Sequence, residues 1–137
     1  MKLVFAVCLI VVGTSYALVA QDSLQPVMQR GIHVQMPVSN QAAEIPAADG
    51  ENATVVTLTA EGRLFLGVQP VEVDVLANLG RSKVYVKVDA RASYQQVLTA
   101  ISALHGHPLV LLTAPTVMAG PGKITPPYGV RLTLLAR

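Results

Sequence analysis

The sequence predicts an α+β fold: an N-terminal single membrane helix, or a signal peptide, followed by a small mixed β-sheet with two helices packed on one face. Three observations lead to this prediction. The first twenty residues are almost wholly apolar. Alternating apolar and β-branched residues mark strands between residues 54 and 89. Helical spacing of apolar residues recurs between the strand segments, so we expect a helix to connect two parallel strands.

The apolar run Leu3–Ala20 follows a single Lys2 and contains no charged residue. It is about long enough to cross a bilayer, which takes roughly 17–25 apolar residues. One Lys before the run favours an N-terminus that stays inside and a remainder that is exported. The same run fits a cleaved signal peptide, because Ser15 and Ala17 match a small-residue cleavage pattern. Both alternatives stay open, and both export everything after Gln21.

Four regions are predicted along the 137 residues. Residues 1–21 form the anchor or signal segment, and residues 22–50 form a Pro-rich linker. Residues 51–114 form the one compact exported domain that a chain of this length has room for. Residues 115–137 form a tail rich in Pro and Gly that contains one further strand, at 129–135.

One ordered piece is predicted within the linker. Ile32, Val34 and Met36 alternate with other residues, so they share one face of a short extended segment. Pro37 ends this segment or marks it as an edge, because proline cannot donate a ladder hydrogen bond.

A β-hairpin is predicted at the start of the domain. Thr54–Thr59 is rich in β-branched residues, and Leu64–Leu66 is the returning strand. Between them Gly62 is able to adopt the positive φ that a tight turn needs. Gly67 and Pro70 then break the strand pattern.

Two helices follow, on either side of the clearest strand. Residues 71–79 have the spacing of a short amphipathic helix, with Gly80 as its C-terminal glycine. Ser93 caps a second helix that runs to about His105. The strand at 83–89 directs Val84, Val86 and Val88 to one face and Lys83, Tyr85, Lys87 and Asp89 to the other.

The second helix has one apolar face, and a further strand follows it. Pro108 precedes the nearly all-apolar run 109–113, which is typical of a central strand. The helix face has residues at positions i, i+3, i+4, i+7 and i+10, namely Tyr94, Val97, Leu98, Ile101 and Leu104.

This order of elements resembles the ExbD/TolR family of biopolymer-transport proteins. Residues 31–37 resemble the family's "G-V-x-V-x-L-P" motif, and residues 55–66 resemble its "V-x-V-x-x-x-G-x-I-Y-L" hairpin. Residues 84–97 resemble "V-x-L-x-A-D-x-x-x-x-Y-x-x-V". The resemblance covers about residues 3–114. The positions that match the family motifs, which we interpret as structural, are Gly31, Pro37, Gly62, Asp89 and Tyr94.

The resemblance implies a single-pass protein of the bacterial inner membrane, with a cytoplasmic N-terminus and a periplasmic domain. It implies a homodimer that works with an ExbB/TolQ-like polytopic membrane protein and a TonB/TolA-like protein. The family's proton-carrying aspartate falls near Val12 here, and an apolar residue cannot bind and release a proton. Asp22, the carboxylate nearest to the apolar run, is interpreted as an interfacial loop residue.

Composition and spacing exclude several other functions. The net charge is +2 without a Lys/Arg cluster, so we expect no nucleic acid partner. Cys8 is the only cysteine and lies in the apolar run, so the exported part has no disulfide. His105 and His107 lack a third ligand, so we expect no metal. Gly120–Lys123 lacks P-loop spacing, and no nucleophile elbow or carboxylate pair is seen. We therefore predict no enzyme and no cofactor.

Three functional hypotheses follow. The first is a membrane-anchored accessory subunit of an energy-transducing complex that serves biopolymer transport. The second is a cleaved, soluble periplasmic binding or structural module with an ExbD-like domain. The third, a small exported enzyme, has no catalytic motif behind it.

Overall fold

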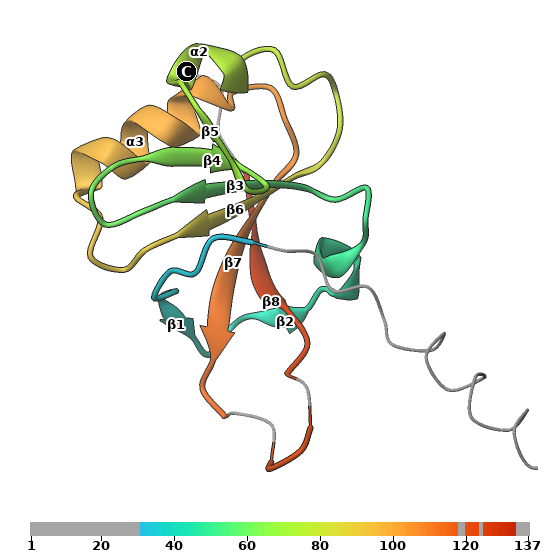
Figure 1. The fold of residues 1–137 in the computed structure, drawn as a ribbon. Helices are drawn as coiled ribbons and strands as arrows, with labels where there is room; N and C mark the ends of the chain where they lie inside the picture. The colour runs from blue at the N-terminus through green and yellow to red at the C-terminus, as the bar shows by residue number, and fades with distance from the viewer. Residues whose placement is uncertain (1–30, 118–119, 124, 134–137) are drawn as a thin grey trace, which may run out of the picture.

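The computed structural model describes residues 31–117, 120–123 and 125–133 (Figure 1). The predicted anchor or signal segment, with Val12 and Asp22, lies outside them. In the described part, no helix is long and apolar enough to span a membrane. The elements in chain order are β1 (Val38–Ser39), β2 (Ala43–Glu44), the 3-10 helix η1 (Pro46–Asp49), β3 (Thr54–Leu58), β4 (Leu64–Leu66), β5 (Gln69–Val71), α2 (Val73–Leu76), β6 (Val84–Val88), α3 (Tyr94–Ala103), β7 (Leu109–Pro115) and β8 (Tyr128–Leu132).

The strands form one mixed sheet, so the predicted α+β class is confirmed. The strand order is β2-β8-β7-β6-β3-β4-β5, and β1 pairs with the far end of β7. The three central strands β3, β6 and β7 are parallel, and antiparallel strands flank them on both sides. The run 109–113, predicted to be a central strand, lies between β6 and β8 as expected.

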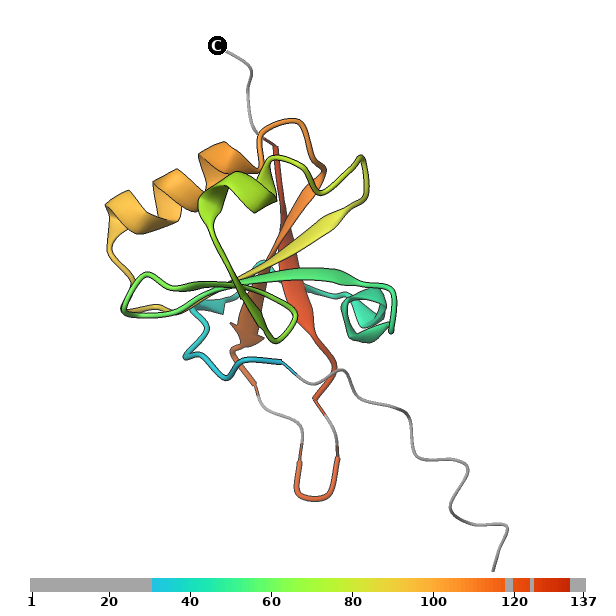
Figure 2. The same ribbon diagram turned by 45° about the horizontal axis from the view of Figure 1, so that its top comes forward.

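Both helices cover the same face of the sheet, as Figures 1 and 2 show. This helical face buries an aliphatic core between the sheet and the helices. Leu76 of α2 and Leu104 just after α3 are both 0% exposed and pack into it. The strand residues of the core are Val56, Leu58, Leu64, Val84, Val86, Val88 and Leu109.

Helix α3 begins at a capping box. The Ser93 hydroxyl accepts a hydrogen bond from Gln96 N, and the Gln96 side chain accepts one from Ser93 N. Its apolar face is only partly as predicted, because Tyr94 is 79% exposed and Leu98 is 43% exposed. The stripe that packs against the core is centred near Val97, and the next residue lies about 100° further round a helix. Leu98 therefore points away from the sheet.

The first predicted helix, residues 71–79, is wrong in its start and its length. Val71 ends strand β5, and α2 spans only Val73–Leu76. Gly67, with φ of 62°, makes a second tight turn after β4, so the chain returns as another strand where the sequence pattern broke. Pro70 is tolerated there because β5 is the end strand of the sheet.

Residues 31–53 cover the opposite face of the sheet, which we call the second face (Figure 2). The extended segment predicted at 31–37 is not assigned as a strand, and β1 begins only after Pro37. Val34 is nevertheless buried, and Pro37 O accepts a hydrogen bond from Ala114 N. Met36 and Ile45 pack over a smaller cluster of Ala48, Tyr85, Val110 and Leu112.

The sheet extends beyond residues 51–114 on both sides. Strand β8 in the tail pairs with β7 from Leu109↔Leu132 to Thr113↔Tyr128, and β2 in the linker pairs with β8. The further strand predicted at 129–135 is present in part as β8, which begins one residue earlier and ends at Leu132; residues 134–135 lie outside the described residues.

Candidate binding groove on the second face

The five positions that match the family motifs do not form one site. Gly62 has a φ of 84° in the β3–β4 turn, and a Cβ there would meet the side-chain amide of Gln96. Tyr94 projects from the first turn of α3 into solvent. Gly31 is exposed, and Pro37 lies beside β7. Each described position has a local structural role or is exposed.

Asp89 joins two segments that lie far apart in the sequence. Its carboxylate is 3% exposed and accepts hydrogen bonds from Arg91 N at 2.9 Å and from Gln35 N at 3.2 Å. The Arg91 guanidinium donates two more, each at 2.9 Å. The Arg91 side chain, then its backbone N–H, hold the pKa of Asp89 well below its usual range. This arrangement matches the interpretation of Asp89 as a strand-end turn residue.

The predicted absence of a metal site stays a prediction. Among residues 31–117, 120–123 and 125–133, no group of three His, Cys, Asp or Glu side chains is placed to hold a metal ion. His107 Nδ1 is buried and has no hydrogen-bond partner within this part of the chain, whereas His33 and His105 are exposed.

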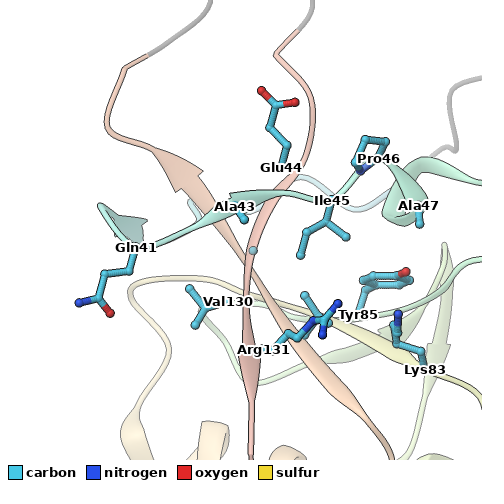
Figure 3. A pocket seen from close by; sticks show the side chains of 12 residues that line it. Gln41, Ala43, Glu44, Ile45, Pro46, Ala47, Lys83, Tyr85, Val130 and Arg131 are labelled. Carbon is cyan, nitrogen blue, oxygen red and sulfur yellow. The ribbon is translucent and has the colours of Figure 1, made fainter.

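A groove of about 510 Å³ lies on the second face, between the β2–η1 segment and strands β6, β7 and β8 (Figure 3). Strand register builds its floor. Tyr85 of β6 pairs with Val110 of β7, which pairs with Arg131 of β8, so the three side chains share one face in a row across the sheet. Lys83 lies two residues before Tyr85 on the same face.

Gly129 allows the β2–η1 segment to lie close over the sheet. A Cβ at Gly129 would come within 2.9 Å of Ile45 Cδ1, Val110 Cγ1 and Leu111 O. Ile45 N donates a 2.7 Å hydrogen bond to Pro127 O, which holds this wall of the groove in place. The absence of a side chain at Gly129 therefore decides how closely Ile45 approaches the floor.

Glu44, the acidic residue that lines the groove, already accepts a hydrogen bond. Tyr128 Oη donates a 3.0 Å hydrogen bond to Glu44 Oε1, across the β2–β8 pairing. This hydrogen bond raises the pKa of Tyr128, because the phenol proton is held by the carboxylate.

Two cations of the groove have no ion-pair partner among the residues that the structure describes. Lys83 and Arg131 are exposed, and within the described residues neither forms an ion pair; the ion pair found there joins Arg91 and Asp89. A third cation of the second face, Lys87, donates a 2.8 Å hydrogen bond from Nζ to Ile32 O, and burial lowers its pKa. The groove therefore combines an apolar floor with two unpaired positive charges, a combination suited to an anionic ligand.

Only part of this groove is predictable from the sequence. Alternation in β6 placed Lys83, Tyr85 and Lys87 on one polar face, which was a usable signal. Arg131 was not identified, because nothing local indicates that the tail strand pairs with β7. The same holds for Glu44 and Ile45, which were assigned to the linker.

No protein-family model matches the chain, and no curated protein matches it either. The fold and the geometry of the groove are thus the observations that support a functional proposal.

Proposed function

We propose that this protein is a membrane-anchored accessory subunit of a proton-motive-force-driven complex of the ExbB–ExbD–TonB or Tol–Pal type. Such a complex supports transport of biopolymers or import of proteins across the bacterial envelope. In this proposal the N-terminal segment anchors the chain in the inner membrane, and the described domain lies in the periplasm. Its role is to hold other proteins, without bond chemistry of its own.

The observation that carries the proposal is the arrangement of Thr54–Thr113. Strands β3, β4 and β5, helix α2, strand β6, helix α3 and strand β7 follow one another, and both helices pack on one face of the sheet. The ExbD/TolR resemblance implies this order except for strand β5. Two motif positions also have clear structural reasons, since Gly62 needs a positive φ and Asp89 closes the turn before α3.

The partners in this proposal are an ExbB/TolQ-like polytopic membrane protein, a TonB/TolA-like protein and a second copy of the chain. The sheet offers places for them to pair. Strands β5 and β2 are the two ends of the strand order, so each has one edge unpaired within the described residues. An extended segment of a partner can add to such an edge through backbone hydrogen bonds. Val12 lacks an ionisable group, so we assign the proton-carrying carboxylate to a partner.

Co-purification from membranes tests the proposal. The full chain, tagged at its C-terminus and extracted in a mild detergent, is expected to bring down a polytopic membrane protein of the ExbB/TolQ kind. Recovery of the chain without such a partner, under conditions that keep a reference complex of this type intact, would contradict it.

N-terminal sequencing of the mature protein separates anchor from signal peptide. An intact Met1 is the expected result. A mature start near Leu18 or Gln21 would instead favour a cleaved, soluble periplasmic module, because Ser15 and Ala17 match a cleavage site.

A further inference from the structure

Lys83 and Arg131 are the two cations of the groove that have no ion-pair partner among the described residues. Lys83 and Arg131 come from β6 and β8, strands that are separated by β7 in the sheet, and both line the groove. In Figure 3 their side chains extend toward the ring of Tyr85. Glu44, the carboxylate in the lining, is held by Tyr128 and does not bond to either cation. Two like charges held on one face attract an anionic group between them.

The floor between these cations is apolar and firmly placed. Tyr85 is 5% exposed, and Val110 beside it is buried in a central strand. Ile45 forms the facing wall. A ligand that fits this surface therefore has an apolar group next to its negative charge. The groove is open to solvent, and its volume of about 510 Å³ has room for part of an extended peptide.

The charge pattern favours an acidic peptide over a nucleic acid. Protein–DNA interfaces commonly neutralise roughly 6–10 phosphates with Lys and Arg. The groove offers two cations that have no ion-pair partner among the described residues, and Tyr85 is too buried to stack a base. In addition, β2 forms one wall of the groove and one end of the sheet, so its outer edge is open to an extended chain among the residues described.

We propose that this groove binds an extended acidic segment of a partner protein, with a carboxylate between Lys83 and Arg131 and an apolar neighbour against Ala43 and Ile45 of the facing wall. The inference rests on the proposed function in one respect, since it assumes that the domain holds other proteins. It goes beyond that function because it names the surface and the chemistry of the bound segment.

Fluorescence anisotropy on the full chain in detergent tests the proposal. The probe is a fluorescein-labelled octapeptide of alternating Val and Glu, and the matched control peptide has Gln in place of Glu. We expect the acidic peptide to bind about tenfold more tightly than the Gln peptide. Lys83→Gln and Arg131→Gln are each expected to weaken its binding about threefold, and the double variant about tenfold. Lys123→Gln removes an exposed charge outside the groove and is expected to change nothing.

A second experiment reverses the charge of both Lys83 and Arg131. The double variant Lys83→Glu/Arg131→Glu is expected to lose the Val–Glu peptide and to bind an alternating Val–Lys peptide instead. Thermal unfolding of each variant shows whether the fold is retained. This arm also distinguishes a specific groove from general attraction to a chain whose net charge is only +2.

Three results would overturn the proposal. The first is equal affinity for the Glu and Gln peptides. The second is full affinity for the Glu peptide in the double Gln variant. The third is binding of sedimented peptidoglycan, or of anionic lipid vesicles, that depends on Lys83 and Arg131 while peptide binding does not. Failure of the proposed function looks different, because peptide binding would persist although no polytopic partner co-purifies.

Discussion

The two faces of the sheet are built in different ways. On the helical face ten buried residues, all aliphatic, pack between the strands and two helices, whereas the second face has a cluster of four under irregular chain. The second face also carries Lys83, Lys87 and Arg131, and one of its strand residues, Thr57, is buried with a hydroxyl that has no hydrogen-bond partner among the described residues. Burial of apolar area is the main source of stability, so the helical face holds the fold together. The second face buries fewer apolar side chains, and the proposed binding groove lies there.

The largest loss of unfolding free energy is expected from a substitution on the helical face. Leu104→Ala removes a fully buried side chain from the core and is expected to cost about 2–5 kcal/mol of unfolding free energy. For a domain of this size that lowers Tm by roughly 10 °C or more. Leu98→Ala, on the exposed side of the same helix, is the matched control and is expected to cost less than about 1 kcal/mol. Similar Tm shifts for both would break the comparison.

A smaller loss of stability is expected at Gly129, where the second face is most closely packed. Gly129→Ala places a Cβ about 2.9 Å from a backbone oxygen and from two side chains, so something must move. Overpacking of this kind costs about 1–3 kcal/mol, and here it also pushes Ile45 away from the floor of the groove. Gly120→Ala, where a Cβ meets nothing within 4 Å, is the control. Chemical denaturation measures both, and equal stability of the two variants would contradict the close approach.

The contribution of Asp89, which joins Gln35 to Arg91, to the stability of the fold is expected to depend on pH. The folded pKa of Asp89 is depressed below its unfolded value, so its contribution to stability is present above about pH 4 and is lost as pH falls. Asp89→Asn is therefore expected to lower Tm by several degrees at pH 7. The difference in Tm between this variant and the wild type should become steadily smaller as pH falls below about 4.

A pH series of thermal melts checks this prediction. Asp74→Asn, which replaces an exposed aspartate of α2, serves as the control and is expected to track the wild type. A gap between wild type and Asp89→Asn that stays constant down to pH 2 would show that the carboxylate charge is not what joins Gln35 to Arg91.

The elements that could be predicted from the sequence are those whose signals lie within one segment of the chain. The hairpin, the strand at 83–89 and the strand at 109–113 follow from alternation and β-branched residues within each segment, and the Ser93 cap is a local signal as well. Strand β5 is not predictable from the local pattern, because Gly67 and Pro70 interrupt the strand signal and Val71 fits a strand and a helix equally well. Tertiary pairing with β4 decides the outcome.

The groove was harder to predict because no single segment contains it. Its walls come from the β2–η1 segment, from β6 and from β8, which meet only through the strand order. Gly129 illustrates the difficulty, since in sequence it is one of several glycines in a Pro-rich tail. Only the register with Leu112 and Ala43 shows why a side chain does not fit there.

The smallest effect on stability is expected from the cations of the groove. Lys83→Gln and Arg131→Gln remove exposed charges without an ion-pair partner among the described residues, so each should change the unfolding free energy by less than about 0.5 kcal/mol. Removing one of two neighbouring like charges can even be slightly stabilising, because their mutual repulsion is lost. Denaturant unfolding at low and high salt measures this. If either variant were destabilised as much as Leu104→Ala, these side chains would belong to the folding core, and the division between a stabilising face and a binding face would fail.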